Sequence, residues 1–280
     1  MQETTVTIQT TDGIEIHTVA WLPDTAPRAV IMIAHGIGEH SGRYRHVAAY
    51  LVEQGYAVHA LDHRGHGKSG GERVYFESFD VAVNDLKQVI DTVKAQHTGL
   101  PMILMGHSMG SLITLLFALK YQSDLAGVIS SGTPLTLETT VPSFVASLLR
   151  MLERIMPRAK FIAVDPNDLS HDPQVIADYK ADPLTSNDRI NLRMVAGLVN
   201  NAQHVRDNLH TLTLPLLILH GEADALAPKT GSDLLYAQAA STDKTLKIYP
   251  NLYHETLNEP EKQTVLDDIG AWLEGQFPPA

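Results

Sequence analysis

The stretch Gly106-His107-Ser108-Met109-Gly110 decides the fold of this chain. It follows an apolar run at residues 102–105 and precedes an apolar helical pattern at residues 112–119, which together predict a strand, a tight turn and a helix. A serine at the apex of such a turn has a strained backbone and needs small residues two positions on either side, which Gly106 and Gly110 provide. Its hydroxyl is then exposed above the sheet, at the N-terminus of the following helix. Because G-x-S-x-G also occurs by chance, the prediction depends on a base and an acid following in the right order.

Alternating strand and helix patterns surround this turn. They predict an N-terminal hairpin and then strand–helix units, which build a mostly parallel sheet with right-handed crossovers, flanked by helices. The expected strands are 5–9, 14–22, 29–34, 57–61, 102–105, 126–131, 214–219 and 246–249, and the expected helices are 44–54, 79–96, 112–119 and 261–277.

The alternation stops after Thr133-Pro134, and helical periodicity broken by prolines continues to about residue 205. We therefore expect residues 1–134 and 206–280 to form the α/β core, and residues 135–205 to form an all-helical cap. Such an insertion covers the carboxyl edge of the sheet, where ligands bind in folds of this class. We find no internal repeat.

Composition excludes several classes of protein. The chain has 280 residues, a formal net charge of −11 and no cysteine. The negative charge and the lack of a Lys/Arg-rich run argue against a nucleic-acid partner, and the lack of cysteine excludes disulfides, thiolate metal sites and a cysteine nucleophile. No signal-peptide pattern and no apolar run of roughly 20 residues is present. We expect a soluble, cytoplasmic protein.

A serine nucleophile needs a base and an acid that orients the base. The order Ser, acid, His of α/β-hydrolases selects His254, on the loop between the last predicted strand and the last helix, from the 14 histidines. Asp224 follows the strand at 214–219 by a short loop and is the predicted acid, with Glu222 as its rival. His220 ends that strand and is expected to be structural.

The oxyanion formed during acyl transfer needs two backbone donors. We assign them to the N–H groups of Ile37, in the glycine-containing loop after the strand at 29–34, and of Met109, after the serine. The histidine- and glycine-rich loop at residues 62–71 matches no phosphate or zinc pattern. We therefore expect this loop to brace the active site, without a metal or another cofactor.

Three stretches together resemble the monoacylglycerol lipases and related lysophospholipase-like serine hydrolases of the α/β-hydrolase fold. They are His35-Gly36-Ile37-Gly38-Glu39-His40-Ser41-Gly42-Arg43-Tyr44, Asp62-His63-Arg64-Gly65-His66-Gly67-Lys68-Ser69 and the serine turn. The resemblance supports the predicted triad and oxyanion donors. It implies that Glu39, Arg43 and His107 lie near a polar pocket for a glycerol head group and that Tyr179 is the tyrosine of the cap. Ser111 departs from the family, which commonly has glycine there.

The activity implied by the resemblance is hydrolysis of a monoacylglycerol to glycerol and fatty acid through an acyl-enzyme. Lysophospholipase and general carboxylesterase activities share the triad and remain alternatives, as does a ligand-binding protein that has lost turnover. A peptidase needs an acidic site for a substrate amine, for which Glu39 is the candidate, and a haloalkane dehalogenase is disfavoured because its nucleophile is aspartate.

The cap segment at residues 142–157 has apolar residues at helical spacing and charged residues on another side. Two interpretations remain open. The segment packs onto the core, or it is an apolar lid that lines an acyl tunnel and makes transient contact with a membrane surface.

Overall fold

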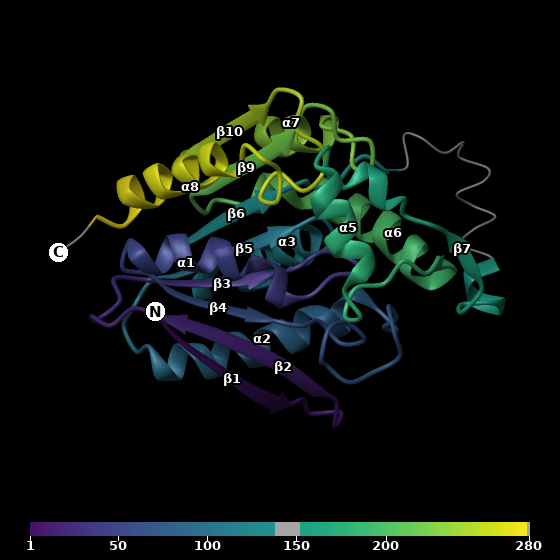
Figure 1. The fold of residues 1–280 in the computed structure, drawn as a ribbon, viewed down its shortest axis with the longest axis horizontal. Coiled ribbons are helices and arrows are strands. Elements are labelled where there is room, and N and C mark those ends of the chain that lie inside the picture. Colours follow the sequence, from purple (N-terminus) through teal and green to yellow (C-terminus); the bar gives the residue numbers. More distant parts are fainter. Residues whose placement is uncertain (138–151, 279–280) are drawn as a thin grey trace.

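The computed structural model describes residues 1–137 and 152–278. Their main feature is an eight-stranded sheet with the order β1-β2-β4-β3-β5-β6-β9-β10 (Figure 1). β1 and β2 form the predicted antiparallel hairpin at one edge, and all pairs from β4 to β10 are parallel. The strands are β1 Gln2–Gln9, β2 Glu15–Leu22, β3 Val30–Ala34, β4 Ala57–Leu61, β5 Met102–His107, β6 Gly127–Ser131, β9 Leu216–Gly221 and β10 Lys244–Tyr249.

The order of the strands creates a crevice between β3 and β5. These two strands pair in register, with Ala34 opposite Gly106. After β3 the chain passes to β4 on one side, whereas after β5 it passes to β6 on the other side. The two loops therefore diverge at the carboxyl ends of the strands, which is where ligands bind in open α/β sheets.

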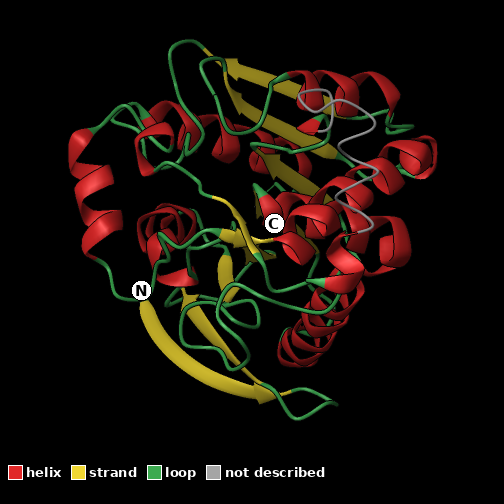
Figure 2. Cartoon of the chain, turned by 90° about the vertical axis from the view of Figure 1, so that its right-hand side faces the viewer, coloured by secondary structure: helices red, strands yellow, loops and turns green. Residues whose placement is uncertain are grey.

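Helices cover both faces of the sheet, as the view from the cap side shows (Figure 2). The side chains of β3 alternate between two apolar cores: Val30 and Met32 pack in the core with α2 and α3, whereas Ile31 and Ile33 pack in the core with α1 and α8. This two-sided burial explains the continuous apolar run in the sequence. The helices are α1 Arg45–Glu53, α2 Phe79–Gln96, α3 Met109–Tyr121, α7 Thr230–Gln238 and α8 Lys262–Gln276.

The segment between β6 and β9 lies beyond the carboxyl ends of the parallel strands (Figure 1). Its described part contains α5 Pro173–Ala181, α6 Leu192–Asn208 and a small antiparallel ribbon of β7 Lys160–Ile162 and β8 Ile190–Asn191. The expectation of an all-helical cap is therefore wrong. Strands of two and three residues are too short to show period-two alternation, and their pairing joins segments far apart in the sequence. The helix α7 was also not predicted.

Part of the predicted lid, residues 142–151, lies outside the described residues, whereas residues 152–155 are helical. Within 1–137 and 152–278, no helix combines the length and the apolarity that a membrane crossing requires. The domain boundaries at 135 and 205 stay a prediction.

Candidate active site

Ser108 lies at a sharp turn between β5 and α3. Its φ of 53° and ψ of −121° are unfavourable for a residue with a side chain. The flanking glycines are needed for packing: a Cβ on Gly106 would overlap the carbonyl of Gly110, and one on Gly110 would overlap the carbonyl of Ala34. The turn therefore forms as the sequence predicts, with α3 packed closely against the end of β3.

Asp224 and His254 come together from the loops after β9 and β10. The Nδ1 atom of His254 lies 2.7 Å from Oδ2 of Asp224. Oδ1 of Asp224 accepts hydrogen bonds from the backbone N–H groups of Leu226 and Ala227, each at 2.9 Å. The carboxylate is fully buried, whereas the rival Glu222 is exposed. The geometry therefore selects Asp224 as the partner of His254.

The acid and the base shift each other's pKa. Burial alone would raise the pKa of Asp224, but the charge of His254 and hydrogen bonds from His220 and His254 outweigh it and hold this pKa well below its usual range. Burial would lower the pKa of His254, yet the charge and hydrogen bond of Asp224 raise it above its ordinary value. Nε2 of His220 lies 3.2 Å from Oδ2 of Asp224, so this histidine supports the acid.

Ser108 and His254 line the same cavity, which has a volume of about 420 Å³. The ring of His107 packs against the ring of His254, with 4.7 Å between centroids. Apolar side chains from the cap line one part of the cavity, and they include Ile162, Val164, Leu169, Ile190, Val195, Leu198 and Val199. The polar part of the lining includes Glu39, His107, Tyr179 and Glu255.

The predicted oxyanion donors lie at this cavity. Ile37 and Met109 both line it, and within the described residues neither backbone N–H has a protein acceptor. A Cβ on Gly36 would lie 3.2 Å from Cβ of Ser108, so the loop backbone runs against the serine. Two unpaired amide donors therefore lie at the cavity that Ser108 lines, and their role as oxyanion donors stays a prediction.

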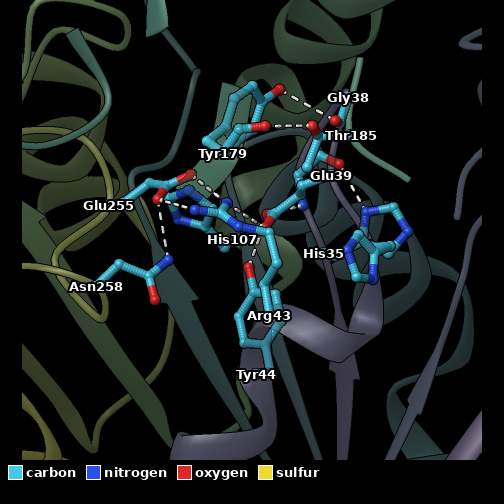
Figure 3. Close-up of polar contacts among 12 residues, drawn as sticks. His35, Gly38, Glu39, Arg43, Tyr44, His107, Tyr179, Thr185, Glu255 and Asn258 are labelled. Atoms are coloured by element: carbon cyan, nitrogen blue, oxygen red, sulfur yellow. Dashed lines mark hydrogen bonds and ion pairs between the residues drawn. The ribbon is translucent and has the colours of Figure 1, made fainter. Parts of the chain in front are cut away.

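A buried cluster of charges supports the loop that carries Ile37 (Figure 3). Arg43 donates to Glu39 at 2.9 Å and, through both terminal nitrogens, to Glu255 at 2.5 and 2.6 Å. Oε1 of Glu39 accepts from the Gly36 N–H at 2.6 Å and from the Tyr44 hydroxyl at 2.8 Å. Burial alone would raise the pKa of Glu255, but Arg43 lowers it, and both carboxylates stabilise the charge of Arg43 and raise its pKa.

The structure refines the roles that the resemblance implied. Glu39 and His107 line the cavity, whereas Arg43 lies behind Glu39 and Glu255 and holds them. Sequence reasoning missed Glu255, although its position directly after His254 was the one available signal. Tyr179 lines the cavity, but its hydroxyl donates to the carbonyl of Gly38 at 3.0 Å and its ring lies 5.0 Å from Cζ of Arg43.

Replacing Arg43 by methionine is expected to destabilise the fold strongly. The change leaves two carboxylates, each less than 5% exposed, without their shared cation. Breaking such a buried pair costs about 3–5 kcal/mol of unfolding free energy, which urea titration measures. Arg45→Met removes an exposed arginine, paired with Glu3 at the surface, and should cost less than about 0.5 kcal/mol. Equal stability of the two variants would contradict a buried charge cluster.

The loop at residues 62–71 supports the neighbouring loop that follows β3. Oδ1 of Asp62 accepts from the Ser41 N–H at 2.7 Å, and Oδ2 accepts from the Lys68 N–H at 2.8 Å. The backbone N–H of His63 donates to Nε2 of His35 at 2.9 Å. Among residues 1–137 and 152–278, no group of three or more histidines and carboxylates has an arrangement that suits a metal ion. The hydrogen bonds of Asp62 and His63 agree with the expected bracing role.

Ser111, where the resemblance leads us to expect glycine, faces a small cluster of hydroxyl groups. Its Oγ lies 2.7 Å from Oγ of Ser130 and 3.0 Å from Oγ1 of Thr133, and all three residues are buried. The hydroxyl is satisfied inside the fold, and Ser111 does not line the cavity.

Buried histidines predict that the protein unfolds in mild acid. These histidines are neutral in the fold, whereas in the unfolded chain they titrate near 6.5, so below that pH the unfolded state binds more protons and stability falls. Each contributes up to about 1.4 kcal/mol per pH unit until its folded pKa is reached. The raised pKa of His254 stabilises the fold as the pH falls towards 6.5, and below that pH its contribution no longer changes. Burial lowers the pKa of His35, His59 and His107 to about 4, of His66 to about 3, and of His63 well below 6.5.

Urea unfolding at pH 7.5, 6.0 and 5.0 measures this effect. We expect the midpoint to fall steeply below pH 6.5, because there the unfolded chain takes up protons on histidines that stay neutral in the fold. A midpoint that is constant over this range would show that these side chains are protonated or exposed in the native state.

A family model described as serine aminopeptidase, S33, matches residues 25–261. A monoacylglycerol lipase of Mycolicibacterium smegmatis is 38% identical over 93% of both chains, and the monoglyceride lipase of Homo sapiens is 37% identical over 94% of this chain and 88% of its own. The solved structure of Paleococcus ferrophilus monoacylglycerol lipase has a TM-score of 0.84 at 30% identity, covering 94% of this chain and 99% of that one.

Proposed function

Since this chain belongs to the serine aminopeptidase S33 family, whose fold is that of the α/β-hydrolases, and is a serine ester hydrolase, we propose that it is a monoacylglycerol lipase. The reaction converts a monoacylglycerol and water to glycerol and a fatty acid. One observation carries the proposal: a single cavity is lined by Ser108, by His254 with Asp224 hydrogen-bonded behind it, by buried polar groups and by an apolar wall from the cap.

The mechanism is acyl transfer in two steps. His254 takes the proton of Ser108 while the serine oxygen attacks the ester carbonyl, and the buried Asp224 stabilises the imidazolium that forms. The N–H groups of Ile37 and Met109 stabilise the oxyanion, with each donor worth about 3 kcal/mol. The imidazolium then protonates the leaving glycerol oxygen, and water hydrolyses the acyl-enzyme by the same sequence.

The lining of the cavity suits a substrate with an apolar chain and an uncharged polar head. Val195 and Leu198 of α6 offer apolar surface to an acyl chain, whereas Glu39, His107 and Glu255 make another part of the lining polar. The two carboxylates and Arg43 carry a formal net charge of −1 as a group. This charge repels the phosphodiester of a lysophospholipid, so the observation favours a glycerol head over the lysophospholipase alternative.

A substrate panel tests the proposal. We expect kcat/KM for a monoacylglycerol to exceed that for lysophosphatidylglycerol of the same chain length, whose head group carries a net negative charge, by at least about tenfold, which corresponds to about 1.4 kcal/mol. An aminoacyl anilide should not be cleaved, because Arg43 already occupies both carboxylates that a substrate amine would need. Faster turnover of either competing substrate would contradict the proposal.

We also propose that the protein is cytoplasmic and that it takes up substrate at a membrane surface through the cap. Ile155, Met156, Phe161 and Ile162 are 43–72% exposed, and Ile162 also lines the cavity. Exposed apolar side chains interspersed with basic residues, which here include Arg154, Arg158 and Lys160, favour an anionic lipid interface.

Vesicle co-sedimentation tests the membrane contact. A variant with Ile155→Ser, Met156→Ser and Phe161→Ser should lose most of the binding of the wild type to vesicles that contain anionic lipid. Val6→Ser and Tyr236→Ser remove apolar side chains that are also exposed but lie outside the cap, and should leave binding unchanged. Equal recovery of all these proteins with vesicles would remove the membrane contact from the proposal.

A further inference from the structure

The peptide bond between Gly36 and Ile37 carries the loop donor of the oxyanion hole. Its N–H belongs to Ile37, and its carbonyl belongs to Gly36. Nδ1 of His35 lies 2.7 Å from this carbonyl oxygen. Because the peptide is planar, a hydrogen bond that fixes the carbonyl also fixes the direction of the N–H on the same bond.

The contacts of His35 determine which of its nitrogens carries the proton. The Gly36 carbonyl only accepts, so Nδ1 must donate. The backbone N–H of His63 only donates, and it lies 2.9 Å from Nε2, so Nε2 must accept. The ring is fully buried, and burial lowers its pKa to about 4, which keeps it neutral. The rings of His63 and His66 pack beside it, with centroids at 4.7 and 5.3 Å.

The backbone groups on either side of Ile37 are also held. Oε1 of Glu39 accepts from the Gly36 N–H at 2.6 Å. The Gly38 carbonyl accepts from the Ser186 N–H at 2.8 Å and from the Tyr179 hydroxyl at 3.0 Å, so the cap restrains the far end of the loop. Among the described residues, the Ile37 N–H has no protein acceptor. The loop is therefore rigid around one donor that is left for a ligand.

We propose that His35 is a positioning residue, which aims and polarises the Ile37 N–H through its Nδ1–H hydrogen bond to the Gly36 carbonyl. A hydrogen bond to the carbonyl end of an amide strengthens the N–H at the other end as a donor. The effect is largest when negative charge develops on the substrate oxygen, so it lowers the barrier to acyl transfer more than it changes ground-state binding. This inference rests on the proposed function.

Two substitutions separate the two hydrogen bonds of His35. His35→Asn keeps a donor near the position of Nδ1 and loses the acceptor for His63, whereas His35→Gln keeps an acceptor near Nε2 and loses the donor to Gly36. We expect the glutamine variant to lose about 10²-fold in kcat with little change in KM, and the asparagine variant to stay within about fivefold of wild type. A trifluoromethyl ketone, which forms a tetrahedral adduct with the serine, should lose affinity in parallel with kcat.

His59→Gln is the matched control. His59 is a buried histidine of β4, and within the described part of the chain the ring hydrogen bond shown for it is to Nε2 of His97, 2.9 Å away. Its replacement should lower the thermal midpoint without changing kcat. Equal kcat values for the two His35 variants would overturn the proposal. A purely structural role predicts that kcat does not depend on which variant keeps a donor to the Gly36 carbonyl.

A measurement on the wild type covers the case in which a His35 variant does not fold. Nitrogen-15 NMR of labelled histidine should show Nδ1 protonated, and the Nδ1 proton should move downfield when the trifluoromethyl ketone adduct forms. A proton on Nε2, or a signal that the adduct leaves unmoved, would refute the role of His35. If Ser108→Ala retained full activity, the proposed function itself would fail. This outcome is distinct from His35 variants that leave kcat unchanged.

Discussion

Ser108→Ala loses at least about 10⁴-fold in kcat for monoacylglycerol hydrolysis, as expected for removal of the nucleophile from a triad that acts as a unit. Alanine lacks the oxygen that attacks the ester carbonyl, while His254, Asp224 and the oxyanion donors stay in place. Residual turnover reflects the remaining donors and substrate binding. A continuous ester hydrolysis assay measures kcat, and labelling by a fluorophosphonate should be lost as well.

Ser111→Ala is the control for this experiment. It makes the same chemical change three residues along the same helix, where the hydroxyl bonds to Ser130 and Thr133 rather than facing the cavity. It should cost about 1 kcal/mol of stability through lost hydrogen bonds and leave kcat within about threefold. Retention of activity in Ser108→Ala, with circular dichroism like that of the wild type, would exclude Ser108 as the nucleophile.

Asp224→Asn is expected to lower kcat by about 10⁴-fold. The amide presents an N–H to Nδ1 of His254, which favours the tautomer with its proton on Nε2, the nitrogen that must accept from Ser108. The acid limb of the pH–rate profile should also move. In the wild type Asp224 raises the pKa of His254, so activity falls as the pH drops through a value above 6.5. Without the carboxylate, burial lowers this pKa and the limb shifts to lower pH.

Glu222→Gln tests the alternative acid. Glu222 is exposed, and within the described residues the carboxylate that pairs with His254 is that of Asp224. Its replacement should leave both kcat and the pH profile unchanged. If Glu222→Gln lost activity and Asp224→Asn kept it, Glu222 rather than Asp224 would be the acid that pairs with His254.

Much of the fold could be predicted because its signals are local. The strand and helix on either side of Ser108, the N-terminal hairpin and the helix at 79–96 depend on period-two or period-3.6 patterns within a few residues. The ribbon of β7 and β8 could not be predicted, because its strands are too short for a pattern and pair across α5. The helix α7 was missed as well, and its alternation of polar and apolar residues is weak in so short a segment.

The chemistry could be predicted from local motifs: a serine flanked by glycines two positions away on either side, a histidine and an aspartate in the order that this fold requires, and a loop that resembles those of monoacylglycerol lipases. How these residues are held became visible in the folded chain. Two of these contacts join residues that are distant in sequence: Arg43 pairs with Glu255, and the Tyr179 hydroxyl donates to the Gly38 carbonyl. The tautomer of His35 likewise depends on its contact with His63. The physical reason is that a motif specifies which groups are present, whereas desolvation and hydrogen-bond geometry, set by the packed sheet and cap, specify which partner each group takes.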